Sequence, residues 1–258
     1  MLGTTVSGRR RRTALAHACI ACHKPWAVIN AAGYVRVADA EHEPELCRRE
    51  NVLGPAVLAE ACAERGLPLA TFSSDLVFDG RAGPYVEADA VNPACIYGHA
   101  KAEAERAVLE RCPAALVVRT SAFFGPWDRH NFVLAVLQAL AAGNAVEASN
   151  DVVSPTYVPD LAHVVLDLLI DGEGGIWHLA SPGAMSWRGF AERIARTAGF
   201  DPDLVAEAPD APGGRLNTVL TSTRGLLLPP LETAIGRYFR DCETDWRPRG
   251  EVPAVAAE

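Results

Sequence analysis

Short apolar runs alternate with helical segments along most of this 258-residue chain. The runs occupy residues 27–30, 67–72, 115–119 and 175–179, and each has the length of a buried strand. Between and after them, the apolar spacing predicts helices at 51–65, 96–111, 131–142, 159–170, 187–198 and 231–239. Strands that alternate with helices of this length predict a parallel sheet with right-handed crossovers. The pattern therefore predicts an α/β fold.

The charge balance excludes two classes of partner. The chain holds 32 Asp and Glu against 24 Lys and Arg, a net charge of −8. An acidic chain of this kind is not suited to coating nucleic acid or anionic lipid, and no apolar stretch is long and charge-free enough to span a bilayer. Seven cysteines at irregular spacing argue against a secreted disulfide framework. We therefore expect a cytoplasmic protein without nucleic-acid or membrane partners.

The first 25 residues depart from the alternating pattern. Four arginines at 9–12 precede a weakly apolar stretch, as in an export signal, but that stretch contains His17 and continues directly into the first strand. Cys19, Cys22 and His23 match the haem attachment motif. We interpret this as a chance match, because covalent haem needs an exported chain and an axial partner. Residues 1–25 are treated as an atypical N-terminal segment.

Tyr97 and Lys101 lie four residues apart on the predicted helix 96–111, so they share one face. A nearby ammonium group stabilises phenolate, and we expect it to lower the pKa of Tyr97 from about 10 toward neutral pH. Such a tyrosine can donate a proton to a carbonyl oxygen while hydride reaches the carbon. The same spacing also occurs by accident in helices rich in Ala, Glu and Lys.

Small and hydroxylated residues follow two of the predicted strands. Ser73, Ser74 and Asp75 come after the run 67–72, and Ala31 and Ala32 come after the run 27–30. Ligands of open α/β sheets bind at the carboxyl ends of the strands, where a hydroxyl can hydrogen-bond a reacting carbonyl. Small residues there let a flat cofactor approach the backbone. An ordinary turn uses the same residue types, so these features gain weight only in combination.

Longer phrases of sequence carry a resemblance to a known family. They are VINAAGY at 28–34, SSDLVFDG at 73–80, YGHAK at 97–101, RTS at 119–121, NFV at 131–133 and SPTYVPDL at 154–161. In this order and spacing, they make the chain similar to the extended short-chain dehydrogenases/reductases, and within them to the dTDP-4-dehydrorhamnose reductase family. The resemblance extends from about residue 26 to about residue 239.

The resemblance implies a Rossmann-like parallel sheet, incomplete at its N-terminus, with a smaller C-terminal α+β substrate lobe. It divides the chain into the atypical segment 1–25, a partial dinucleotide-binding domain 26–125, a sugar-nucleotide-binding lobe 126–245 interleaved with the sheet, and a flexible tail 246–258. The implied activity is reduction of a nucleotide-linked 4-keto sugar by NADP(H) or NAD(H), in dTDP-rhamnose biosynthesis for cell-wall polysaccharide.

The resemblance also implies roles for individual residues. The implied catalytic residues are Ser74, Tyr97 as general acid, and Lys101. Cofactor contacts are implied for Ala31, Ala32, Asn51, Ser73, Tyr97, Lys101, Thr120 and Ser121. Substrate contacts are implied for Asp75, Asn131, Thr156, Tyr157 and Arg215. No metal ligands are expected.

The family's N-terminal strand and glycine-rich turn, which hold the cofactor pyrophosphate on a helix N-terminus, have no match here. Only Gly3 and Gly8 precede Gly33. We therefore expect an exposed apolar sheet edge at 27–30, weak binding of the dinucleotide, and a homodimer, fusion or partner domain that supplies the missing strands. Two other functions stay open: a non-catalytic sugar-nucleotide-binding or regulatory subunit, and epimerase or dehydratase chemistry with the same tyrosine and lysine.

Overall fold

Four parallel strands form the central sheet of the computed structural model, which describes the backbone of residues 3–209 and 214–242 and the side chains from residue 13 onward. Their order is β1 (Val28–Asn30), β2 (Leu69–Phe72), β3 (Leu116–Arg119) and β8 (Gly175–His178). All four predicted strands are present, and the predicted α/β class with a parallel sheet is confirmed. The predicted tail 246–258 lies outside the described residues.

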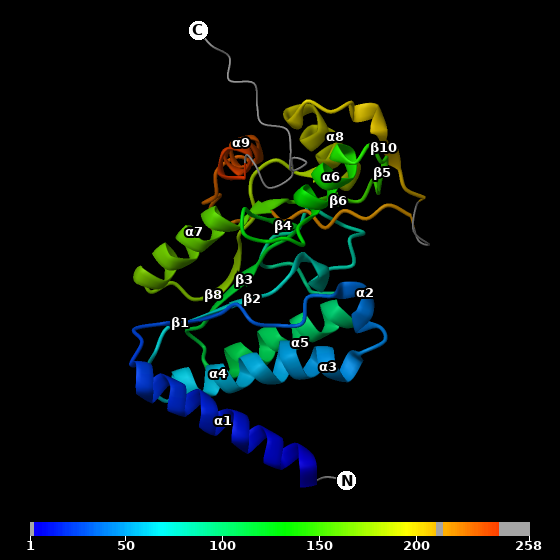
Figure 1. The fold of residues 1–258 in the computed structure, drawn as a ribbon. Coiled ribbons are helices and arrows are strands. Elements are labelled where there is room, and N and C mark those ends of the chain that lie inside the picture. Colours follow the sequence, from blue (N-terminus) through cyan, green and yellow to red (C-terminus); the bar gives the residue numbers. More distant parts are fainter. Residues whose placement is uncertain (1–2, 210–213, 243–258) are drawn as a thin grey trace.

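Helices cover both faces of this sheet (Figure 1). The helices α1 (Gly3–His23), α4 (Gly54–Ala63) and α5 (Ile96–Arg111) lie on one face, and α7 (Val158–Ile170) lies on the other. Because side chains alternate along a strand, Val117 packs with the first group of helices, whereas Leu116 and Val118 pack with α7. Packing on both faces explains why β3, with all four residues buried, has three consecutive apolar residues, Leu116–Val118, before Arg119.

The predicted helix 51–65 corresponds to the end of a π-helical turn η1 (Arg49–Leu53) and to α4, which begins at Gly54. Two short helices that were not predicted, α2 (Val37–Ala40) and α3 (Pro44–Arg48), precede it. Pro55 stands at the start of α4, where its missing N–H costs no intrahelical hydrogen bond. The chain leaves α4 at Glu64 and turns through Gly66, whose φ is +63°.

The residues after Phe124 form a smaller lobe with its own core. Its helices are α6 (Phe132–Ala141), α8 (Trp187–Ala198) and α9 (Leu231–Asp241). Three short strand pairs join them: β4 (Phe123–Phe124) with β7 (Thr156–Tyr157), β5 (Val146–Ala148) with β10 (Val205–Glu207), and β6 (Val152–Val153) with β9 (Met185–Ser186). Phe124, Tyr157, Phe190 and Tyr238 are central in this core. The chain returns from this lobe to the sheet as β8.

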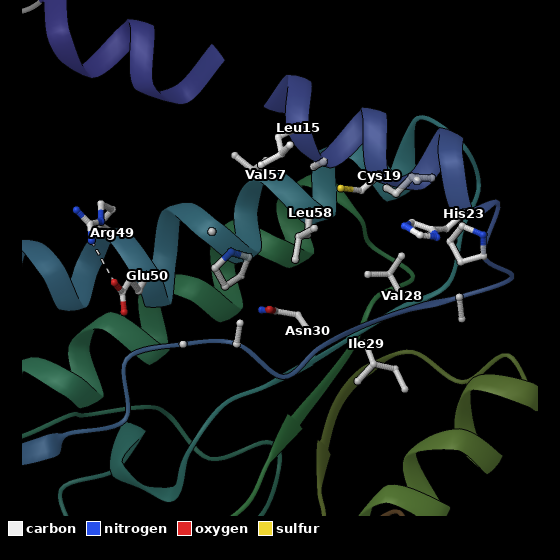
Figure 2. Close-up of a pocket in the computed structure, with 18 residues that line it drawn as sticks. Leu15, Cys19, His23, Val28, Ile29, Asn30, Arg49, Glu50, Val57 and Leu58 are labelled. Atoms are coloured by element: carbon white, nitrogen blue, oxygen red, sulfur yellow. Dashed lines mark hydrogen bonds and ion pairs between the residues drawn. The ribbon is translucent and has the colours of Figure 1, made fainter. Parts of the chain in front are cut away.

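The β1 edge of the sheet faces a large hollow. Within the described residues β1 pairs only with β2, and Ile29 is 42% exposed. Helix α1 packs on α4 next to this edge through Ile20, which lies in one core cluster with Ala59 and Cys62. Figure 2 shows the hollow of about 860 Å³ that β1, α1 and α4 surround, with Leu15 from α1 and Val57 and Leu58 from α4 among its walls.

Among the described helices, none is both long and apolar enough to cross a membrane.

Candidate active site

A cavity of about 430 Å³ lies where the ends of β2 and β3 meet the smaller lobe. Its walls contain six residues that the sequence placed in the site: Ser73, Ser74, Asp75, Tyr97, Thr120 and Ser121. Ser73 and Ser74 directly follow β2, and Thr120 and Ser121 directly follow β3. Since parallel strands end at the same edge of a sheet, residues far apart in sequence meet here.

The start of α5 brings Tyr97 to this cavity. Cys95 caps the helix, because its Sγ accepts a hydrogen bond from the backbone N–H of Gly98 at 3.3 Å. Gly98 also permits a very close approach, since a Cβ at this position would lie 2.1 Å from the backbone oxygen of Leu76. Glycine in the segment 97–101 therefore holds the helix start tightly against the turn η2 (Asp75–Val77) that follows Ser74.

Lys101 lies one helical turn after Tyr97, as predicted. Its Nζ atom is 5.5 Å from the centroid of the Tyr97 ring and donates a hydrogen bond to the backbone oxygen of Phe72 at 3.1 Å. Burial lowers the pKa of Lys101 to about 8, so the ammonium form still predominates at neutral pH.

The pKa of Tyr97 differs from the expectation. Tyr97 is only 9% exposed, and burial is the main reason why its pKa is raised above the usual value of 10. The negative charge of Asp75 raises it further. The prediction that Lys101 brings the pKa of Tyr97 down toward neutral pH is therefore wrong for this structure, because burial outweighs the effect of the cation. Tyr97 therefore keeps its hydroxyl proton at neutral pH.

Asp75 is the centre of a hydrogen-bond network at the cavity wall. Its Oδ2 atom accepts hydrogen bonds from Ser121 Oγ at 2.7 Å and Thr218 Oγ1 at 2.6 Å, and its Oδ1 atom accepts one from Ser74 Oγ at 3.0 Å. Burial raises the pKa of this carboxyl, although the three hydroxyl donors oppose the shift. Asp75 thus ties together the ends of β2 and β3 and the segment around Thr218.

The predicted cofactor residues outside the cavity lie around the loop that follows β1. Ala31 and Ala32 are exposed there, and Ala32 lines the hollow of Figure 2. Asn51 is buried on η1 and holds this loop in place. Its side-chain oxygen accepts a hydrogen bond from the backbone N–H of Tyr34 at 2.8 Å, and its side-chain nitrogen donates one to the backbone oxygen of Tyr34 at 3.0 Å. Gly33 fits beneath it, since a Cβ there would lie 2.7 Å from Asn51 Oδ1.

Three predicted substrate residues in the smaller lobe use their polar atoms within the chain. Asn131 caps α6 by accepting from the Leu134 N–H at 3.0 Å, and its amide donates to Gly125 and Asp128. Thr156 is fully buried and donates to Ser154, and Tyr157 donates to Asp241 at 2.5 Å. None of the three lines the 430 Å³ cavity. Substrate contact by these residues stays a prediction.

Arg215, the last predicted substrate residue, lies on the surface. Its guanidinium is 2.8 Å from Glu207 in an ion pair, and its side chain is 56% exposed. The next residue, Leu216, does line the cavity. A substrate role for Arg215 also stays a prediction.

Several cavity residues were not identified from the sequence. They are Val35, Val37, Phe123, Asp151, Val153, Trp187, Leu216 and Thr218. Trp187 packs edge-on against Phe132, with ring centroids 4.7 Å apart. Asp151 holds the segment around Thr218, because its Oδ1 atom accepts from the Leu216 N–H at 2.8 Å. Asp151 lies just before the conspicuous phrase at 154–161, which is the one sequence signal that points to it.

Two buried groups near the ends of β2 and β3 remain able to hold a ligand: Thr120 lines the 430 Å³ cavity, whereas Lys101 lines a separate small cavity that also touches Ser73. Thr120 Oγ1 is buried and makes no hydrogen bond within the described part of the chain. Lys101 Nζ donates one hydrogen bond and carries three hydrogens. These groups match the hydroxyls of a ribose. No cluster of three or more His, Cys, Asp or Glu side chains suited to a metal ion occurs in the described ranges.

Comparison with known proteins gives a consistent family. Residues 10–214 match the family model described as RmlD substrate binding domain. The dTDP-4-dehydrorhamnose reductase of Mycolicibacterium smegmatis is 40% identical over 183 residues, which are 69% of this chain and 56% of that protein. The protein of the same name from Aggregatibacter actinomycetemcomitans is 37% identical over 66% of this chain and 60% of its own length. The chain thus spans less than two thirds of the length of these curated relatives.

A solved structure shows the same fold. The dTDP-4-dehydrorhamnose reductase of Bacillus anthracis, in complex with NADP, superposes with a TM-score of 0.82 and 26% identity. The match covers 90% of this chain and 85% of that one.

Proposed function

Because the chain belongs to the RmlD substrate binding domain family, we propose that it reduces a nucleotide-linked 4-keto sugar with NADP(H) or NAD(H), as dTDP-4-dehydrorhamnose reductases do. The observation that supports this most is the cavity, which gathers Ser74, Tyr97 and the Asp75 network between the sheet and the smaller lobe. The sequence likeness to proteins named dTDP-4-dehydrorhamnose reductase supports the sugar class.

The chemistry follows from the groups in the cavity. A nicotinamide dinucleotide supplies hydride to the carbonyl carbon when it is bound. Tyr97 donates its hydroxyl proton to the carbonyl oxygen, so the C=O group becomes a CH–OH group. The raised pKa of Tyr97 keeps that proton on the phenol until the oxygen develops negative charge. Lys101, positively charged beside the Tyr97 ring, stabilises the phenolate that remains.

Ser74 is proposed to hold the substrate carbonyl. Its Oγ atom accepts from the Leu76 N–H at 3.1 Å and donates to Asp75 at 3.0 Å, which fixes the hydroxyl at the cavity wall. A substrate carbonyl oxygen that accepts the hydrogen bond from the Ser74 hydroxyl replaces Asp75 as its acceptor. Asp75 keeps its Ser121 and Thr218 donors in that case, so its charge stays compensated.

The described residues fit one half of the dinucleotide. The unpaired hydroxyl of Thr120 and the buried Lys101 suit the nicotinamide ribose. The pyrophosphate half has no matching strand, glycine turn and helix, because no strand precedes β1 among the described residues. The NADP bound to the Bacillus anthracis structure supports a nicotinamide cofactor in this family member.

We also propose that the β1 edge receives strands from another chain, either a partner domain or a second copy. Within the described part of the chain the β1 backbone is paired on one side only, and the adjoining hollow has largely apolar walls. Cross-linking or light scattering of the purified chain tests this. A monomer that stays soluble at high concentration would count against it.

The proposal places the chain in the cytoplasm, in dTDP-rhamnose biosynthesis for cell-wall polysaccharide, as the family likeness implies. The lack of a fit for the pyrophosphate also favours a second candidate, a sugar-nucleotide-binding subunit without catalysis. The assay that separates the two is NADPH oxidation with a dTDP-4-keto sugar at millimolar NADPH. Product formation supports the reductase, and calorimetric binding of the sugar nucleotide without turnover supports the binding subunit.

A further inference from the structure

Glu105 and Arg119 form a buried ion pair next to Ser73, the residue that follows β2. We propose that its acidic member, Glu105, is a positioning residue, which fixes Ser73 beside Ser74 and places a buried negative charge one helical turn from Lys101. This inference rests on the proposed reductase function for its effect on activity, but the charge of Lys101 can be measured without any reaction.

Glu105 continues the functional face of α5. Tyr97, Lys101 and Glu105 are spaced at i, i+4 and i+8, so all three side chains leave the helix on the same side. Lys101 and Glu105 both line a small cavity that also touches Ser73. One helix face therefore carries the proton donor, the cation and a carboxylate in sequence.

The Glu105 carboxylate is fully used within the interior. Its Oε1 atom accepts from Ser73 Oγ at 2.5 Å and from Arg119 Nε at 2.8 Å, and its Oε2 atom accepts from Arg119 Nη2 at 2.7 Å. Glu105 is 5% exposed and Arg119 is 2% exposed. A buried pair of this kind adds little net stability compared with apolar residues, so stability alone does not account for it. Its geometry supplies a further role, because it fixes the hydroxyl next to Ser74.

The hydrogen bond to Glu105 changes the assignment of Ser73. The Ser73 hydroxyl has a single proton, and that proton points to the carboxylate. Ser73 can therefore accept a hydrogen bond from a cofactor but has no proton to donate to one. Its backbone N–H is also fixed, by the Val118 oxygen at 2.7 Å.

The charges around Lys101 favour a specific effect of Glu105. Burial lowers the pKa of Lys101 to about 8, and only Cys47 from α3 and Glu105 from its own helix act to raise it. Other acidic groups on the elements packed against α5 are Asp39 on α2, Glu45 on α3, Glu50 on η1, Glu60 on α4 and Asp75 on η2. Asp39 and Glu50 form ion pairs with Arg36 and Arg49 at the surface.

The experiment follows Lys101 itself by NMR in chain labelled with ¹³C at the lysine ε-carbon. The sequence has two lysines, Lys24 and Lys101, so Lys24→Arg assigns both signals. We expect a midpoint of about 8 for Lys101 in the unaltered chain. Glu105→Gln should lower that midpoint by about one pH unit or more, because the carboxylate is lost while the Arg119 cation stays.

A matched control lies on the same helix. Glu103 also follows Lys101 on α5, but it forms a surface ion pair with Arg48 at 2.6 Å. Glu103→Gln should leave the Lys101 midpoint unchanged. Glu105→Gln/Arg119→Met removes both buried charges together and avoids an unpaired cation, so it folds even where the single variant does not. It should lower the midpoint less than Glu105→Gln does.

The same variants test positioning in the reaction. Activity that needs charged Lys101 falls as the pH rises through its pKa, so the alkaline limb of kcat/KM should move to lower pH in Glu105→Gln and stay in place in Glu103→Gln. An unchanged Lys101 midpoint in folded Glu105→Gln or in the double variant would overturn the inference. A shifted midpoint without turnover in any variant, including the unaltered chain, would instead count against the reductase function alone.

Discussion

Thr218→Val should loosen the junction between the sheet and the smaller lobe. Thr218 is 5% exposed, and its hydroxyl donates at 2.6 Å to the carboxyl of Asp75, which is a charged acceptor whenever Asp75 is ionised. A hydrogen bond to a charged group contributes about 1.5–3 kcal/mol, and valine has nearly the same volume as threonine, so little cavity cost is added. We expect a loss of about 2 kcal/mol in the free energy of unfolding, which lowers Tm by about 4–8 °C in a chain of this size.

The loss should depend on pH. Burial is the largest effect on Asp75 and holds its pKa above the usual 3.8. The contribution of Asp75 to stability is therefore greatest at pH values below its pKa in the unfolded chain, and it decreases as the pH rises through its pKa in the folded chain. Removing the Thr218 donor raises the folded pKa further. The destabilisation by Thr218→Val should therefore be largest at neutral and alkaline pH, and should shrink as acid protonates Asp75.

Urea unfolding followed by circular dichroism at several pH values measures both effects. Thr221→Val is the matched control, because the described residues include no hydrogen bond from the Thr221 hydroxyl; it should change stability by less than about 0.5 kcal/mol. A loss no larger than that in Thr218→Val, or a loss that is the same at acidic and alkaline pH, would refute the role given to Asp75.

Three further predictions concern ligands and the smaller lobe. Asn131→Ala should lower the free energy of unfolding by about 1 kcal/mol, because the N-terminal cap of α6 is lost. Unchanged stability together with weaker dTDP-sugar binding in calorimetry would contradict this and favour the substrate role implied by the family. Trp187→Ala should weaken dTDP-sugar binding by about tenfold, since a large aromatic side chain is lost from the cavity wall. Trp127→Ala is the control, because Trp127 is 80% exposed and does not line the cavity. Equal effects of the two substitutions on binding would contradict the proposed site. In a fluorescence titration, NADPH should bind with a dissociation constant above the micromolar range, because the described residues beside β1 include no glycine turn that could hold the pyrophosphate. A micromolar dissociation constant in a monomer would show that another group holds the pyrophosphate.

The middle of the central sheet was predictable because β2 and β3 are buried on both faces. Continuous apolar runs such as 115–119 have few other interpretations when helices alternate with them. The two-residue strands of the smaller lobe, such as Val152–Val153, gave no such signal. Their pairing is decided by contacts distant in sequence, and two residues are too few for an alternating pattern.

Part of the site was predictable for a similar reason. Tyr97 and Lys101 are related by helix geometry, and Ser74 by its position after a strand, so local spacing identifies them. Thr218 and Trp187 reach the cavity from segments without a motif, through the fold of the whole lobe. The direction of the Tyr97 pKa shift was missed because burial cannot be read from the spacing of two residues.

The most direct test of the account is a single-turnover measurement of NADPH oxidation. The chain is mixed with millimolar NADPH and a dTDP-4-keto sugar, and the unaltered chain is compared with Tyr97→Phe. The account predicts that the unaltered chain forms reduced sugar in amounts equal to the NADPH consumed. It also predicts that Tyr97→Phe reduces the rate by about a hundredfold or more, the range expected for loss of a general acid. Turnover by Tyr97→Phe close to that of the unaltered chain would contradict the assignment of Tyr97 as the proton donor.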